Sequence, residues 1–416
     1  MSVKECLKNG NYIEAIEKLK ELQEWTDESL EHMAEAECKL HNYRSAYSYY
    51  ILANNIEKAN DMLSKVSKTE LEIEYGEHIH PNVRIWKING NRGVIATSDL
   101  KEGEEICKIP LYLCIGGTMR ERMDYLLESN VYTRSLPLLS TFPVLWTPNT
   151  CDQIAPSPMR LILEQKIMEW KKEYITDKAM YNRSLIGSRC FANKGDYLVP
   201  FADMLNHSNN PNVDWEFVKD HFVMRTSRPV KAHEELLDYY GPKSNYESFL
   251  HYGFVQENNT KLDVVRVIAD LPNKVAKTRL DPRYFDKSFE FELRGSYMEG
   301  TVEIFSFLRY IRSNEKRCPE TLKGFLRKPI SKENELWVCK MLFNILQQDV
   351  HRRVKFNDVD NPLAISLLQS EMKVLIHWGE VLRKAIRIME ENDKKALKQE
   401  TNDYLVKVIK AKNYYK

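Results

Sequence analysis

The fold prediction rests first on the stretch YLVPFADMLNHSNNPNVDWEF, residues 197–217. An apolar run, residues 198–202, leads directly into the hydrogen-bonding side chains of Asp203, Asn206 and His207. An Asn amide and a His ring can each donate and accept hydrogen bonds, so this pair suits the polar edge of a ligand. The same pair also occurs in ordinary turns whose side chains satisfy one another, and the pair alone does not choose between these interpretations.

A second stretch, EELLDYYGPKSNYESFLHYGF at residues 234–254, follows after a polar segment typical of a strand. It contains a tyrosine pair, Tyr239-Tyr240, directly before Gly241-Pro242, which is a turn signal. Side chains alternate along a strand, so we expect Tyr240 to point toward a site and Tyr239 the other way, toward packing.

Two further motifs complete a set in chain order. Asn91-Arg92-Gly93-Val94 precedes IATSDLKEGEEICKIP, and Arg189 lies in SRCFA before the first stretch. In this order the motifs resemble those of the SET-domain methyltransferases, in the branch typified by the Rubisco large-subunit lysine methyltransferase. The resemblance covers roughly residues 75–265.

The resemblance implies an α+β protein. It has a β-rich SET fold split by a helical insertion at about residues 111–190, with helical regions on both sides. We expect an N-terminal helical region at 1–70, the SET domain at 71–265 and a helical C-terminal domain, similar to a substrate-binding domain, at 266–416.

The resemblance also implies an enzyme that uses S-adenosylmethionine to methylate a protein, with lysine as the target. Tyr240 is the expected catalytic residue. The residues expected to bind the cofactor are Asn91, Arg92, Gly93, Val94, Asn206, His207, Tyr240 and Phe254. Those expected at the substrate are Arg189, Phe191 and Asp203. No metal is expected, because His207 has no second ligand at a useful spacing.

The chemistry of the residues agrees with these roles. Arg92 can pair with a carboxylate of the cofactor, and Gly93 allows a close backbone approach because it has no Cβ. Phe191 offers either an apolar wall with a π face for a methylated ammonium or simple helix packing. Asp203 either bonds the target ammonium or caps the following turn. Methyl transfer needs a neutral amine, alignment and a dry channel, so no catalytic triad or carboxylate pair is required.

Two alternatives stay open. One relative in this branch methylates a histidine of actin, with an asparagine and a tryptophan where this chain has Phe191 and Ala202; the apolar Phe191 and small Ala202 favour lysine. The other is an inactive SET scaffold that binds partners through its helical ends, against which Asn206, His207 and Tyr240 together argue.

Amino-acid composition limits which binding partners and which cellular compartment we expect. Lys and Arg number 61 against 60 Asp and Glu, so bulk capture of nucleic acid is not expected. The polar opening of the sequence does not resemble a signal peptide, and we expect no membrane span because no apolar run is long enough. Its eight cysteines include no Cys-x-x-Cys pair, which favours the cytoplasm or nucleus. The expected partner is a protein substrate, and nothing indicates an oligomeric state.

Periodicity predicts the remaining elements. Residues 1–66 read as helices with a tetratricopeptide-like repeat of about thirty residues, or as an ordinary helical cap. VRIWKINGNRGVIAT predicts a hairpin around Asn89-Gly90, and EICKIP predicts a strand. Helices are expected in MRLILEQKIMEWKKEYI, TVEIFSFLRYIRS and ENELWVCKMLFNILQQDV, and from about residue 362 to 400.

Overall fold

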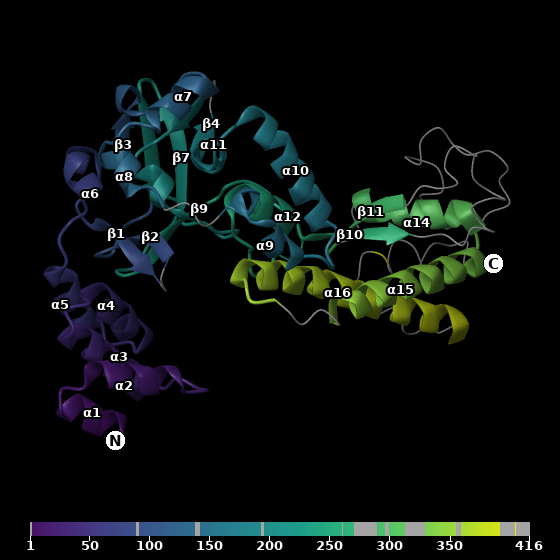
Figure 1. Cartoon of the computed structure of the whole chain (residues 1–416), viewed down its shortest axis with the longest axis horizontal. Helices are drawn as coiled ribbons and strands as arrows, with labels where there is room; N and C mark the ends of the chain where they lie inside the picture. The colour runs from purple at the N-terminus through teal and green to yellow at the C-terminus, as the bar shows by residue number, and fades with distance from the viewer. Residues whose placement is uncertain are drawn as a thin grey trace. The chain divides into compact units, whose positions relative to one another are not determined.

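The computed structural model describes two compact units (Figure 1). The described residues are 2–88, 91–137, 142–192, 195–259, 261–269, 289–295, 299–312, 329–354, 359–391 and 404. The first unit comprises Met1–Pro137 and Ser188–Gly241, and the second comprises Leu138–Gly187 and Pro242–Lys416. This grouping puts most of the expected insertion with the C-terminal residues. The three-part division expected from the sequence stays a prediction.

Five helices open the first unit, as the sequence predicts. They are α1 (Val3–Lys8), α2 (Tyr12–Lys20), α3 (Asp27–Lys39), α4 (Tyr43–Leu52) and α5 (Ile56–Lys65). The same turn joins α1 to α2, α3 to α4 and α4 to α5. In each, a residue with positive φ (Gly10, His41 or Asn54) precedes an Asn at the N-cap of the next helix. The repeat seen in the sequence is therefore a recurring turn, with a third copy that sequence analysis missed.

These helices share a core with the strands of the same unit. The ring of Tyr47 in α4 meets the edge of Trp86 at 4.7 Å between centroids, and Trp86 is 1% exposed. Tyr47 also hydrogen-bonds His233 at 2.8 Å. The N-terminal helices are thus packed against the sheet rather than held apart from it.

Nine short strands follow among the described residues of the first unit. They are β1 (Val83–Ile88), β2 (Asn91–Ala96), β3 (Glu105–Pro110), β4 (Cys190–Ala192), β5 (Asp196–Leu198), β6 (Asn206–His207), β7 (Val213–Val218), β8 (His221–Thr226) and β9 (Glu235–Asp238). They form a sheet in the order β1-β2-β9-β6, a second in the order β3-β8-β7, and a β4-β5 hairpin. β6 pairs in parallel with β9, and the other pairs are antiparallel. The order β2-β9-β6 brings together motifs that lie more than a hundred residues apart.

The predicted hairpin and strand are confirmed. β1 and β2 pair from Val83↔Ala96 to Ile88↔Asn91, which leaves a two-residue connection. The connecting Asn89-Gly90 lies outside the described residues. EICKIP forms β3, in which Lys108 is exposed between two buried pairs, Ile106-Cys107 and Ile109-Pro110.

Short helices complete the first unit. They are α6 (Glu70–Glu74), η1 (Gly76–His78), η2 (Leu111–Leu113), α7 (Met119–Tyr125), α8 (Val131–Ser135) and η5 (Ala202–Met204). The chain returns to this unit through the last residues of α11 (Asp177–Arg189).

The second unit is mainly helical. Its elements are η4 (Pro143–Leu145), α9 (Pro148–Asp152), α10 (Met159–Glu173), α12 (Asn245–Glu247), η6 (Ser248–Tyr252), β10 (Val264–Ala269), β11 (Phe289–Arg294), α14 (Glu299–Arg312), α15 (Lys332–Val354) and α16 (Pro362–Glu391). The four predicted helices are confirmed as α10, α14, α15 and α16. The last part of the predicted final helix, after Glu391, lies outside the described residues.

The C-terminal region also contains a β-hairpin that sequence analysis missed. β10 and β11 pair in antiparallel fashion, from Val264↔Arg294 to Ala269↔Phe289. Val265, Val267 and Leu293 of this hairpin are fully buried in one core with residues of α14, α15 and α16. The strict alternation of FEFELR was the available signal.

None of the described helices combines the length and the hydropathy that crossing a membrane requires.

Candidate functional site

The site begins at a strained turn. Phe201 has φ 72° and ψ −51°, a backbone region that is costly for a residue with a side chain, yet its side chain is completely buried. Burial of the Phe201 side chain offsets the backbone strain. The turn at Phe201 sets the direction in which η5 follows the apolar run. The chain then enters β6 at Asn206.

β6 is held against β9 by both backbone and side-chain bonds. Asn206 lies opposite Leu237 and His207 opposite Asp238. The amide of Asn212, which is 0% exposed, accepts from Leu237 N at 2.7 Å and donates to Glu235 O at 2.8 Å. Asn212 therefore locks the parallel pairing. It was not predicted, although its position in the polar NPN run was the available signal.

Asn206 connects three strands through its side chain. Its Nδ2 donates to the backbone oxygen of Arg92 and to Oε1 of Glu235, each at 2.8 Å. Both amide hydrogens are thereby used inside the protein, which leaves Oδ1 as the atom that can accept from a ligand. Burial raises the pKa of Glu235, and the hydrogen bond from Asn206 opposes that rise.

A side chain at Gly93 would crowd this same contact. A Cβ at Gly93 would lie 2.4 Å from Oε1 of Glu235 and 3.0 Å from Nδ2 of Asn206. The sequence predicted that the backbone at Gly93 comes close to the cofactor. In the structure, the side chains of Glu235 and Asn206 also come close to it. Any larger residue would displace the carboxylate and amide that align β2, β6 and β9.

His207 and Tyr240 form the other half of the site. The backbone N–H of Tyr240 donates to Nδ1 of His207 at 3.1 Å, so a neutral His207 carries its proton on Nε2. The Tyr240 hydroxyl donates to the carbonyl oxygen of Leu205 at 2.6 Å. The ring centroids of His207 and Tyr240 lie 5.1 Å apart. The structure therefore brings the predicted catalytic tyrosine together with the Asn-His motif.

The prediction that the side chain of Tyr239 packs in the interior is wrong. It is 40% exposed, because β9 ends at Asp238 and the strand alternation no longer applies to the residues that follow.

Asp203 lies in a buried ion pair. Its Oδ2 accepts from Nη1 of Arg189 at 3.1 Å and from the hydroxyl of Tyr132 at 2.9 Å. Burial opposes the charge of Arg189, but Asp203 and the nearby Tyr132 and Tyr240 raise its pKa. Burial, reinforced by Asp203, raises the pKa of Tyr132 far above its usual value, so the phenol stays a donor. Tyr132 was missed because nothing in its sequence neighbourhood marks it.

The remaining predicted residues occupy different environments. Phe191, on β4, packs against Trp215 and Phe222 at 5.2 and 4.8 Å between centroids, an aromatic cluster of strands rather than a helix contact. Arg92 donates to the backbone oxygen of Ser135. Val94 is fully buried within its sheet.

The cofactor and substrate roles of all these residues stay predictions, as do the cofactor roles of Asn91 and Phe254. Asn91 is in β2, but its side chain lies outside the described part of the chain. Phe254 follows η6 and belongs to the second unit, with its ring 6.0 Å from that of Tyr252. Among the described residues, no group of three or more His, Cys, Asp or Glu side chains could hold a metal ion.

Comparison with known proteins identifies the region that contains this site. Residues 91–241 match the SET domain family. The chain contains a SET domain. The matched span begins at β2 and ends directly after Tyr240, so it includes the paired strands β2, β9 and β6.

Solved structures show the same fold over most of the chain. A structure of Rubisco LSMT bound to AdoMet aligns with 81% of this chain and 97% of its own, with a TM-score of 0.55 and 18% sequence identity. A structure of the SET domain of LSMT bound to lysine and AdoHcy aligns with 81% and 96%, with a TM-score of 0.53 and 17% identity. The likeness therefore extends beyond the SET domain.

Curated relatives match over shorter stretches. The N-lysine methyltransferase setd6 of Xenopus tropicalis is 31% identical over 99 residues, 23% of this chain and 22% of that protein. The ribosomal lysine N-methyltransferase set10 of Schizosaccharomyces pombe is 25% identical over 223 residues, 47% of this chain and 41% of that protein. These alignments span less than half the length of the relatives.

Proposed function

We propose that this protein is an S-adenosylmethionine-dependent protein-lysine N-methyltransferase. The observation that carries the proposal is the contact between the Tyr240 hydroxyl and Leu205 O, beside Asn206-His207 in a SET domain. The names of the relatives support lysine as the target, since setd6 and set10 are both described as lysine methyltransferases.

The donor set fits the proposed cofactor. Asn206 offers the Oδ1 acceptor, and His207, with Nδ1 used by Tyr240 N, carries a donor on Nε2. The Oδ1 acceptor of Asn206 matches the amino group of an adenine ring. Arg92 supplies a positive charge on the adjacent strand for a carboxylate. When bound, S-adenosylmethionine supplies a methyl group on a sulfonium, which is a good leaving group.

The protein's own residues can hold a neutral amine. The hydroxyl hydrogen of Tyr240 points at Leu205 O, so the phenol oxygen presents lone pairs. The Tyr240 and Leu205 oxygens can therefore both accept N–H bonds from an amine and leave its nitrogen lone pair for attack. Because Arg189 balances the charge of Asp203, this carboxylate does not stabilise a protonated lysine as an unpaired one would. This favours a positioning role for Asp203.

The test is transfer of labelled methyl from S-adenosylmethionine to proteins of a matched cell lysate. Tyr240→Phe should lower transfer about a hundredfold or more, since a positioned hydroxyl typically contributes that much. Tyr239→Phe is the matched control, because its hydroxyl belongs to an exposed neighbour, and it should retain wild-type transfer. Equal activity of the two variants would contradict the role given to Tyr240.

Mapping the labelled residue decides between the two enzymatic alternatives. Label on lysine supports the proposal, and label on histidine would replace it with histidine methylation. Absence of both label and calorimetric binding of S-adenosylmethionine would overturn the methyltransferase assignment.

We also propose that the substrate is a protein in the cytoplasm or nucleus. The described cysteines are free thiols, which suits a reducing compartment. Fractionation of cells that express the tagged protein would test this, and secretion of the protein would contradict it.

A further inference from the structure

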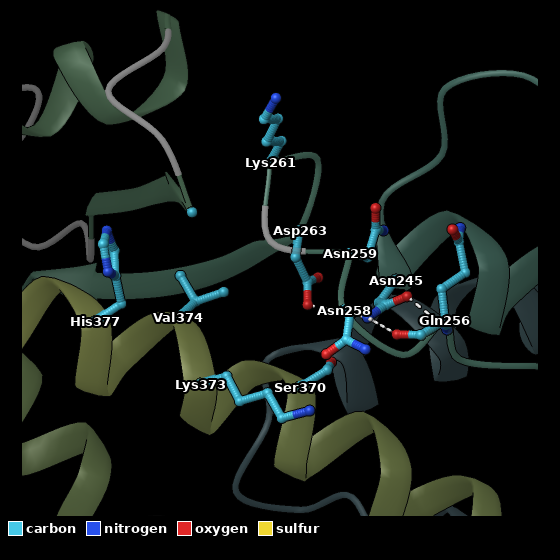
Figure 2. Close-up of a pocket in the computed structure, with 11 residues that line it drawn as sticks. Asn245, Gln256, Asn258, Asn259, Lys261, Asp263, Ser370, Lys373, Val374 and His377 are labelled. Atoms are coloured by element: carbon cyan, nitrogen blue, oxygen red, sulfur yellow. Dashed lines mark hydrogen bonds between the residues drawn. The ribbon is translucent and has the colours of Figure 1, made fainter. Parts of the chain in front are cut away.

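The second unit contains a cavity of about 370 Å³ beside α16 (Figure 2). One wall is the turn formed by residues 256–259 and 261–263. The other is a single face of α16, because Ser370, Lys373, Val374 and His377 recur at helical spacing. No residue predicted for the SET site lines this cavity.

The base of the cavity is polar and already organised. Asn245, Asn259 and Asp263 are each at most 5% exposed. The amide of Asn245 donates to Gln256 O at 3.1 Å and to Asp263 Oδ2 at 3.0 Å, and its oxygen accepts from Gln256 N at 2.8 Å. Asn259 Nδ2 donates to Lys243 O at 2.9 Å. These bonds pin the turn, so a ligand would meet a preformed surface.

Asp263 places a negative charge at this base. Its carboxylate accepts from Asn245 and from Val264 N at 2.9 Å, and no basic side chain of the described ranges forms an ion pair with it. Burial raises the pKa of Asp263 to about 6, although these bonds oppose the rise. At neutral pH the group is mostly ionised and buried, a state that a cationic partner would stabilise. Two hydrogen bonds leave a carboxylate with further acceptor capacity.

The rim has the opposite charge. Lys261 and Lys373 are exposed and lie on opposite sides of Asp263 in Figure 2, and His377 lies farther along the same face of α16. A ligand with only a positive charge would satisfy the base but meet the charge of Lys373. A ligand with only a negative charge would satisfy the rim but meet Asp263. Complementarity to both requires a positive group directed inward and a negative group outward.

We propose that this cavity binds a peptide segment with adjacent basic and acidic side chains, the basic group at Asp263 and the acidic group at Lys373. The site is separate from the proposed methyl transfer and does not depend on it. Asn258, an exposed amide at the rim, can pair with the backbone of such a segment.

The experiment uses the full chain and three capped peptides without cofactor. Acetyl-Gly-Lys-Glu-Gly-amide carries both charges, and replacing Glu or Lys by Gln leaves only one. Calorimetry or NMR titration should show the doubly charged peptide binding about fivefold tighter than either singly charged one, the size of a modest charge coupling. Lys373→Gln should abolish the preference for Glu. Arg387→Gln, an exposed arginine farther along α16, is the matched control and should keep it.

Several outcomes would overturn the proposal. They are equal affinity for all three peptides, an unchanged Glu preference in Lys373→Gln, and no binding at millimolar peptide. Asp263→Asn should remove the preference for Lys, but it also disturbs two hydrogen bonds of the turn, so the exposed Lys373 variant is the decisive one. Free lysine that binds as tightly as the capped peptide would contradict the assignment to a peptide segment.

Discussion

Two buried carboxylates, one in each unit, are bonded in different ways. Glu371 is 0% exposed; its Oε1 accepts from Ser157 Oγ at 2.5 Å and from the hydroxyl of Tyr246, and its Oε2 accepts from Arg353 Nε at 3.0 Å. Asp203 receives both of its side-chain bonds on Oδ2. Within the described part of the chain, Asp203 Oδ1 and Arg189 Nε are buried without a hydrogen-bond partner.

The difference lies in the carboxylate oxygens, which are both bonded to described residues in Glu371 but not in Asp203. In the second unit, Glu371 ties three segments distant in sequence to α16, with both oxygens bonded. Arg353 Nη2 is buried without a partner in the described ranges, but the carboxylate itself is satisfied. In the SET domain, hydrogen-bonding capacity is left unused beside Tyr240. Unused capacity costs stability, and proteins retain it where function requires it.

The largest expected effect is on Glu371. Glu371→Ala leaves the buried Arg353 without this counter-charge and leaves two hydroxyls without their acceptor, which should cost about 4–5 kcal/mol of unfolding free energy. Denaturant unfolding followed by circular dichroism measures it. Glu380→Ala, an exposed glutamate on the same helix, should cost less than about 0.5 kcal/mol. Similar losses of unfolding free energy in both variants would contradict the structural role of the Glu371 cluster.

Asp203→Asn should destabilise the protein less than Glu371→Ala does, but it should lower methyl transfer more. The amide oxygen can still accept from Tyr132 and Arg189, so we expect a loss of about 3 kcal/mol, from the charge of Arg189 alone. Methyl transfer should fall at least about tenfold because the turn that positions Leu205 is held by this pair. A loss of stability with full activity in the folded fraction would show that Asp203, like Glu371, is only structural.

A buried carboxylate that forms no ion pair with any described residue should respond to pH. Burial raises the pKa of Asp238 to about 6, although the bond from Tyr239 N opposes the rise. The folded state then binds this proton more tightly than the unfolded state, whose pKa is near 3.9. Its contribution to stability is therefore present below pH 4 and lost as pH rises through 6, about 2–3 kcal/mol in all.

Urea midpoints measured from pH 4 to 7 test this sign. Asp238→Asn should remove most of the decline between pH 4 and 6. If the urea midpoints of the wild type and of Asp238→Asn changed equally between pH 4 and 6, the pKa of Asp238 would not be raised by folding.

The smallest effects come from removing one hydroxyl in each cluster. Tyr246→Phe should cost about 2 kcal/mol, since its hydroxyl donates to Glu371 and accepts from Arg266 N at 3.1 Å. Tyr132→Phe, which removes one bond to Asp203, should cost about 1 kcal/mol. Thermal unfolding of both variants ranks them. The reverse order would show that the Asp203 cluster is the more tightly coupled one.

Local patterns were sufficient for much of the fold. The alternation and Asn-Gly turn of residues 83–96 predicted the β1-β2 hairpin, and helical spacing predicted α10, α14, α15 and α16. The motif order from Asn91 to Tyr240 indicated the SET domain. These signals succeed because turn chemistry and side-chain periodicity depend on neighbours within a few residues.

The partners of the site residues depended on the tertiary structure. The amide of Asn206 donates to Arg92 and Glu235 because β6 lies beside β9 and near β2. These partners are 114 and 29 positions away in the sequence. Asp203 contacts Tyr132 of α8, 71 positions away, only in the folded chain. Phe201 tolerates its strained backbone because its side chain is completely buried. Sequence alone predicted which residues to expect at the site. Strand pairing and burial decided which of their atoms are bonded inside the protein.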